Sequence, residues 1–513
     1  MLIGGGPITV GAFRRQAKTL RRRARRMGKA ASSAALFSVF LIFCGCIKVG
    51  PDYKVPVSNT PTQWHMTGDP TFTSDKMCSC DWWTVFDDPL LSRLVVEAKA
   101  CNLELKTAVA RIKEARAKVG IAGSPFFPVL DSTGYLSRER NSANSASFFG
   151  TDTRFNAGLN SSWEVDLFGR ISRSVEAARA DYQVSEEDYA YVMVSLYAEV
   201  ARTYLDVRTV QARLGATEGN IASQQKVLEL TQKRFSFGLA TNLDVSQAEN
   251  ILATSEAQLP PLRELLTRSM NAVALLLGKP PGFFDDELGR PVPIPLPPPQ
   301  AAVGIPADLV RRRPDIREAE RRLAAETARI GVATSDLYPR LTLLGTLGFE
   351  STDAASWMSR GSVFYSLAPT LQWNIFHGGR ILSQIAVQDA LTEQALLQYQ
   401  QIVLKALGEV ENEMKAFVEA RNRKEALERS VAASRRTLDL AVHLYKDGLK
   451  DFQNVLDAER TLFDSENQLA VAKGEIAVAL VQLYKALGGG WGPDGQAPSG
   501  GLQGAGDPLK SKE

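Results

Sequence analysis

A seven-residue repeat of mostly apolar positions is the dominant pattern along the chain. Between residues 403 and 445 the repeat positions alternate between three and four residues apart. A spacing of 3.5 residues places these side chains on one face of a helix that winds around a neighbour. Glu413, Lys424 and Ser434 interrupt the apolar positions. The segment predicts a helix of about 65 Å at 1.5 Å per residue, packed in a partly solvated tube rather than in a dry two-stranded coil.

The same repeat occurs a second time, 210 residues earlier (403 − 193), between residues 193 and 235. Each copy ends in a glycine, Gly238 or Gly448, which suits the left-handed conformation at the end of a helix. Thr241 and Asp451 follow with side chains that can begin another helix. The pattern therefore predicts two long helical hairpins, over residues 171–275 and 381–487.

The repetition extends to whole half-molecules. We expect a first half over residues 85–278 and a second over 307–490, because solenoid repeats have much shorter periods of about 20–50 residues. The segment between them, 279–306, is dense in proline and predicts an extended crossover. The tail over 491–513 is rich in glycine and proline, and we expect it to be disordered.

Two other segments, 129–165 and 341–375, change to a period of two. Their clearest stretch is 155–165, where apolar side chains fall on one face and small polar ones on the other. Strands of about 10 residues with this alternation are typical of outer-membrane barrels, although a half-buried hairpin of a soluble core is the alternative. Trp163 and Trp373 lie 210 residues apart near strand ends (373 − 163). We expect them to anchor the strands at the membrane interface.

The N-terminal region predicts a secretory signal over residues 1–45. A basic stretch precedes the apolar segment 30–43, which is shorter than the roughly 20 residues that cross a bilayer. Met27 also suits the start of a signal, so residues 1–26 are either an upstream extension or a misassigned start.

The signal ends in Gly45-Cys46. A small residue before cysteine is what lipoprotein processing requires, and it predicts that Cys46 carries a covalent diacylglycerol and an N-acyl chain. A proline-containing stretch follows, so residues 46–84 predict a lipidated tether. The alternative is an incidental cysteine at the end of a signal peptide.

Composition excludes several classes of protein. The net charge of +3 comes largely from the first 30 residues, which argues against a nucleic-acid surface. None of the three histidines, His65, His377 and His443, lies in a sequence pattern of metal ligands or catalytic bases. The sequence therefore argues against catalysis and metal binding. Cys78, Cys80 and Cys101 remain, and in an oxidising periplasm two of them can pair, with a connectivity that the sequence leaves open.

Four membrane strands in one chain imply assembly with further copies. An open sheet in lipid leaves unpaired edges, and known barrels start at about 8 strands. Three copies supply twelve strands, whereas two copies supply eight, whose interior side chains would fill. Long helices of mixed polarity would continue such a barrel as a tube through which solutes pass.

Several separated motifs together resemble one family, the TolC-like outer-membrane factors of the NodT type, which are outer-membrane efflux lipoproteins. The resemblance implies a mostly helical chain with transmembrane strands, forming a homotrimer with a 12-strand barrel and a periplasmic α-helical barrel. It implies an exit duct in the outer membrane, without a cofactor, that works with a periplasmic adaptor and an inner-membrane transporter. The motifs are Cys46 followed by 49–53 (VGPDY), 163–170 (WEVDLFGR), 312–316 (RRPDI) and 484–491 (YKALGGGW).

The resemblance also implies a gate at the periplasmic tip. It places an aspartate of the gate at Asp457 and an inward-facing position at Gln453. This chain departs from the family at Gln453, where relatives carry a large apolar residue, so a hydrophobic plug is in doubt there. Asn454 replaces an aspartate of other branches, and Asp244 is its counterpart in the first half. The alternative is that Asp457 and Asp244 are simply acids on a helix surface near a turn.

The turns themselves are expected to contact the adaptor through Gly238, Leu239, Gly448 and Leu449. A duct for type I protein secretion has the same fold and is an alternative function. A lipid-anchored envelope spacer is another, although a spacer has no need of lipid-facing strands.

Overall fold

The structure is a computed structural model that describes residues 47–57, 60–66, 68–73, 80–140, 142, 144 and 151–491. The predicted signal peptide, Cys46, Cys78 and the predicted tail beyond Trp491 lie outside the described residues. The chain divides into two compact units. The first comprises the described residues up to 52 together with 121–176 and 328–388, and the second comprises 53–120, 177–327 and the residues from 389 onward.

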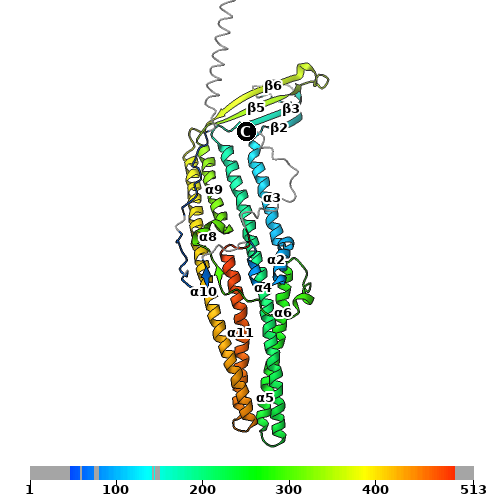
Figure 1. Cartoon of the computed structure of the whole chain (residues 1–513). Helices are drawn as coiled ribbons and strands as arrows, with labels where there is room; N and C mark the ends of the chain where they lie inside the picture. Colours follow the sequence, from blue (N-terminus) through cyan, green and yellow to red (C-terminus); the bar gives the residue numbers. More distant parts are fainter. Residues whose placement is uncertain are drawn as a thin grey trace, which may run out of the picture. The chain divides into compact units, whose positions relative to one another are not determined.

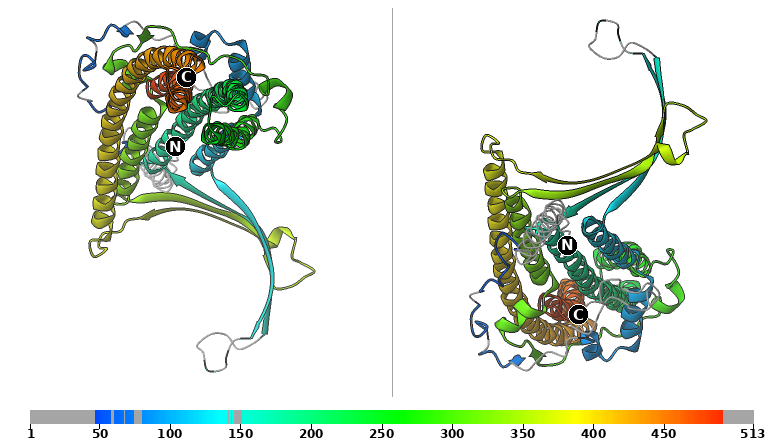
Figure 2. Two further views of the ribbon diagram at one scale, coloured as in Figure 1. Left: turned by 90° about the horizontal axis from the view of Figure 1, so that it is seen from below. Right: turned by 90° about the horizontal axis from the view of Figure 1, so that it is seen from above.

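The first unit contains a four-stranded antiparallel sheet. Its strands, in the spatial order β2-β3-β5-β6, are β2 (Val129–Arg140), β3 (Thr151–Val165), β5 (Arg340–Ser351) and β6 (Val363–Gln372). Each half of the chain supplies one hairpin, and the two halves meet where β3 pairs with β5. Figure 2 shows that the sheet is strongly curved. Among the described residues, β2 and β6 each have one edge without a partner strand.

The register of the sheet puts apolar side chains on one face. Leu159 lies opposite Leu347, which lies opposite Tyr365. One residue along, Asn160, Thr346 and Ser366 form the row that points to the other face. Tyr365 is 82% exposed and Leu367 is 79% exposed. The predicted alternation is therefore confirmed, with its apolar face open in the single chain.

The two tryptophans tie each hairpin to the segment that leads into it. The indole N–H of Trp163 donates to the carbonyl of Phe126 in η2 (Ser124–Phe126), at 3.0 Å. The indole N–H of Trp373 donates to the carbonyl of Leu337 at the same distance of 3.0 Å. Trp373 lies one residue beyond β6, which ends before the predicted limit at 375. Both rings keep an exposed face, so an interfacial role for them stays a prediction.

The second unit contains most of two long helical hairpins (Figure 1). The descending helices, α4 (Arg170–Ser236) and α10 (Arg380–Lys446), each have 67 residues. In the second half α11 (Phe452–Ala486) returns as one helix. In the first half the return breaks into α5 (Asn242–Glu256) and α6 (Leu259–Leu276). Consecutive prolines at the start of α6 explain this break, because each lacks the N–H that would continue the helix.

The predicted heptad positions form the buried seams of α4 and α10. Val200 and Val207 of α4 are fully buried, as are Val410 and Phe417 of α10. Glu413 and Lys424 are only partly buried, in keeping with a partly solvated seam. The interpretation of the heptad stretch as a long packed helix is confirmed in both halves.

The shorter elements correct two sequence-based expectations. The tether predicted over 46–84 contributes to the core, because Trp83 stacks edge-on against Tyr197 at 5.0 Å. The proline-rich crossover also carries short regular elements. These and the other elements are β1 (Phe72–Thr73) paired in parallel with β4 (Ala301–Ala302), η1 (Trp82–Phe86), α2 (Pro89–Cys101), α3 (Leu103–Gly123), α7 (Asp285–Leu288), α8 (Pro306–Arg312), α9 (Pro314–Ser335) and η3 (Arg360–Ser362).

Two further observations concern the described residues alone. Cys101 is a free thiol, so it takes no part in the disulfide considered among the three remaining cysteines. None of the described helices combines the length and the apolar composition needed to span a membrane.

Truncating the seam is expected to destabilise the second unit. Phe417 is fully buried and packs 6.3 Å from Phe72, measured between ring centroids. Phe417→Ala should cost about 3–5 kcal/mol through lost burial and the cavity left behind. The matched control is Lys415→Ala on the same helix, whose ion pair with Glu419 is exposed to solvent and should contribute little to stability. Thermal unfolding followed by far-UV circular dichroism measures both, and equal effects would contradict the packing described.

Candidate functional site

Both helical hairpins turn on glycines at the ends predicted from the sequence. Gly238 has φ +75° and Gly448 has φ +73°, the left-handed region that a side chain strains. The leucine after each glycine donates its N–H to the carbonyl five residues earlier, at 2.8 Å in both turns. This is the Schellman geometry of a helix end. The two turns therefore have the same local structure.

Arg234 joins the two turns. One of its Nη atoms donates to the carbonyl of Lys446 at 2.6 Å. Its guanidinium also lies 4.6 Å from the centre of the Tyr445 ring, within the range of a cation–π interaction. Tyr445 in turn packs 5.2 Å from Phe452 at the start of α11. Burial raises the pKa of Tyr445, which keeps its phenol neutral. The ends of the two hairpins are thus held together.

The predicted gate residues Asp457 and Gln453 lie together on the exposed face of α11. The side-chain amide of Gln453 donates to a carboxylate oxygen of Asp457 at 3.0 Å. Asn454 is directed elsewhere, because its amide donates to the carbonyl of Asp451 at 3.2 Å. The arrangement leaves one carboxylate per chain, paired only with a neutral amide among its described hydrogen bonds.

Asp244, the fourth predicted gate residue, belongs to a helix cap. It accepts a hydrogen bond from the N–H of Thr241 at 2.8 Å, and its own N–H donates to the Thr241 hydroxyl at 3.2 Å. This reciprocal capping box begins α5. The structure thus gives Asp244 a local structural role and does not bring it to the Gln453–Asp457 pair by any described hydrogen bond.

The turns expose apolar side chains. Leu239 is 65% exposed and Leu449 is 69% exposed, at matching places in the two turns. Phe237 and Leu243 are also exposed beside the first turn. Exposed apolar groups gathered in one place are typical of a surface that meets a partner.

Glu459 is a functional candidate that the sequence pattern did not single out. It lies on α11 two residues beyond Asp457 and is only 2% exposed. Neither of its carboxylate oxygens has a hydrogen-bond partner among the described residues. Burial raises the pKa of Glu459 to about 7. Its counterpart 210 residues earlier (459 − 249), Glu249, is exposed on α5, so the same residue type has opposite surroundings in the two halves.

Two other predictions concern the lipid site and metal binding. Cys46 lies outside the described residues, so its lipidation stays a prediction. Among the described residues, no group of histidine, cysteine and acidic side chains has the geometry to hold a metal ion. The sequence pattern also does not indicate Arg173, a buried arginine near the start of α4. No local motif marks its long-range contacts.

Comparison with known proteins gives consistent results over most of the chain. The family described as "Outer membrane efflux protein" matches residues 94–279 and 305–489. Nodulation protein T of Rhizobium leguminosarum bv. trifolii is 31% identical, covering 89% of this chain and 97% of that protein. Pyoverdine export outer membrane protein OpmQ of Pseudomonas aeruginosa is 32% identical, covering 85% and 92% respectively. The solved outer-membrane channel OprN is similar with a TM-score of 0.82 and 34% identity, covering 86% of this chain and 99% of that one.

The buried carboxyl of Glu459 should make stability depend on pH. Folding raises the pKa of Glu459. Its contribution to the stability of the protein is therefore fully present below about pH 4.5, and that contribution is lost as the pH rises through about 7. The difference corresponds to about 3 kcal/mol. We expect the melting temperature to fall between pH 5 and pH 8, and Glu459→Gln to remove part of that fall.

Glu249→Gln is the matched control for this measurement, because the exposed glutamate should leave the pH dependence of the melting temperature as it is. Identical pH profiles for the wild type and Glu459→Gln would show that the carboxyl is not held in an apolar site.

Proposed function

Because the chain belongs to the family of outer membrane efflux proteins, we propose that it is the outer-membrane channel of a tripartite efflux system of the RND type. It resides in the outer membrane and carries small molecules from the periplasm to the exterior. The observation that carries this proposal is the sheet of the first unit, whose strands present an exposed apolar face and, within the described part of the chain, leave both edges unpaired.

The unpaired edges favour a homotrimer. Backbone N–H and C=O groups without partners cost several kcal/mol each in lipid, so β2 must pair with another strand and β6 likewise. Neighbouring copies of the same chain provide those strands. Three copies give twelve strands (3 × 4), which leaves a lumen, whereas eight strands would be filled by their own side chains. In this assembly α4 and α10 would contribute to a periplasmic helical barrel.

The helical turns support a tip-to-tip contact with a periplasmic adaptor. Gly238 and Gly448 fix the turn geometry, and Leu239 and Leu449 expose apolar side chains that an adaptor can cover. The inner-membrane transporter is then reached through the adaptor. OpmQ, named for pyoverdine export, supports a small-molecule cargo for the relative, and by extension for this chain.

The covalent lipid on Cys46 is part of the same proposal. Gly45 and Cys46 provide the processing site, and a diacylglycerol with an N-acyl chain would anchor the N-terminus in the outer membrane. We propose no catalytic role for the chain and no other cofactor.

Two alternatives differ in measurable ways. A duct for type I protein secretion would pass an unfolded polypeptide and work with a different transporter. A non-conducting envelope spacer would pass no solute. It would also not require the exposed apolar side chains of β6, Leu367 and Leu371.

We expect the purified protein to be a trimer that forms channels in a planar lipid bilayer. Native mass spectrometry gives the number of chains, and single-channel recording gives the conductance, which should be mostly in a closed state. Protein that is consistently monomeric and non-conducting would contradict the channel proposal and favour the envelope spacer.

Removing the carboxylate at the proposed gate should open the channel more often. In a trimer Asp457 would form a ring of three acids at the tip, and such rings control the passage of ions. Asp457→Ala should raise the mean conductance by about twofold or more. Asp286→Ala removes an exposed acid from α7, outside the tip, and should leave conductance unchanged. If both variants conduct like the wild type, Asp457 is not part of the gate.

A further inference from the structure

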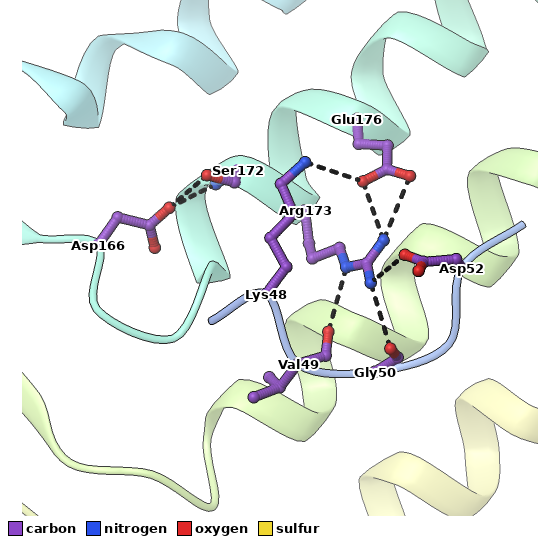
Figure 3. A network of polar contacts seen from close by, with 8 residues as sticks. All are labelled: Lys48, Val49, Gly50, Asp52, Asp166, Ser172, Arg173 and Glu176. Carbon is purple, nitrogen blue, oxygen red and sulfur yellow. Dashed lines mark hydrogen bonds and ion pairs between the residues drawn. The ribbon is translucent and has the colours of Figure 1, made fainter. Parts of the chain in front are cut away.

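A fully buried arginine in the first unit binds the segment that follows the predicted lipid site. Arg173 is only 1% exposed. Its Nε donates to the carbonyl of Val49 at 3.1 Å, and its Nη2 donates to the carbonyl of Gly50 at 3.2 Å and to the carboxylate of Asp52 at 2.8 Å. Its Nη1 donates to Glu176 one turn along α4, at 3.0 Å. Figure 3 shows the guanidinium enclosed by this segment.

The segment also fits closely against backbone. Gly50 has φ +86°, and a Cβ there would collide with the Cα of Gly331 in α9. A Cβ on Gly331 would in turn come within 2.8 Å of the Arg173 side chain. The N–H of Val49 donates to the carbonyl of Phe168 at 3.3 Å. Both glycines are therefore required by close approach, and the fit is specific in shape as well as in charge.

The duplication shows that this fit is built for one segment. Gly331 aligns with Gly120 in the first half, but a Cβ added to Gly120 would meet nothing within 4 Å. The position 210 residues after Arg173 is Ser383, which has no guanidinium. Of two equivalent places in the repeated halves, only one has the arginine and the close glycine contact.

Removing the segment would leave the arginine poorly satisfied. Glu176 would remain as its partner, while the donors now used by two backbone carbonyls would lose those acceptors. A buried charge that loses its partners is strongly destabilising. The Asp52 side chain is mostly exposed, so its ion pair adds little, and the two carbonyls carry most of the recognition.

We propose that residues 47–52 form a strap that docks in a socket built from Arg173, Gly331 and the loop before α4. Arg173 is the positioning residue of this socket. Docking places the N-terminus, because two Cα–Cα steps of about 3.8 Å hold Cys46 within about 8 Å of Lys48. For the lipid, this inference rests on the proposed acylation of Cys46. The socket, and not the lipid, then fixes where the acylated end lies on the first unit.

Limited trypsin digestion of the mature full-length trimer tests the socket. The bond after Lys48 lies at the start of the docked strap, whereas Lys54 is exposed and gives an internal control site. Cleavage after each is read by mass spectrometry as a large fragment that begins at Val49 or at Val55. In the wild type we expect the Val55 fragment to form at least 10-fold faster, because proteolysis follows the population of the open segment.

Arg173→Met should raise the rate of cleavage after Lys48 at least 10-fold and leave cleavage after Lys54 unchanged. Gly50→Ala should do the same while leaving Arg173 in place, so it covers the case in which Arg173→Met fails to fold. The matched control is Arg170→Met, since Arg170 lies on the same turn but pairs with Glu164 at 2.7 Å and not with the strap. Unchanged cleavage after Lys48 in both Arg173→Met and Gly50→Ala would overturn the proposal.

Cys46→Ser separates the socket from the lipid. Loss of acylation, seen in the mass of the N-terminal peptide from the same digest, should leave Lys48 protected. If Lys48 became accessible, the lipid would be holding the strap and the proposal would be wrong. Failure of the channel proposal would show instead in bilayer conductance and chain number, which this digest does not measure.

Discussion

The need to pair every backbone hydrogen-bonding group in lipid governs this protein. The sheet of the first unit satisfies its interior strands, but β2 and β6 each keep one open edge among the described residues. Water can hydrogen-bond to those edges, whereas in a bilayer they are costly. A single chain with four apolar-faced strands therefore cannot satisfy both edges of its sheet in a membrane. We interpret its long helices and turns as parts of the proposed closed ring. The long helices and the tip turns occur in each half, so each half would contribute the same kinds of element to the proposed ring.

The two halves of the chain share the same elements, but some equivalent residues in them have different surroundings. The two tryptophans still make the same hydrogen bond in both halves, each to a carbonyl of the segment that leads into its hairpin. The two glutamates, Glu249 and Glu459, have separated into a solvated and a buried carboxyl. An internal repeat thus contains its own control, because a difference between equivalent positions cannot be ascribed to the fold they share.

The sequence was most informative where a period decides the structure. The heptads predicted α4 and α10, and alternation predicted both hairpins, because burial on one face acts on every residue of an element. It was least informative where one contact decides. The break before Pro260 depends on two adjacent prolines within an otherwise regular pattern. Trp83 joins the core from a polar stretch, and Arg173 depends on a segment more than 100 residues away. No local pattern encodes such contacts.

The order of the chain gives the strap a further meaning. Residues 47–52 come first, yet the socket needs Arg173 from the first half and Gly331 from the second. The strap can therefore dock fully only where both halves are folded. A buried guanidinium that lacks these carbonyls disfavours the packing of the first unit, so docking of the N-terminal segment completes that packing. The end of the chain that is proposed to carry the lipid is then fixed in place only on a chain whose two halves are complete.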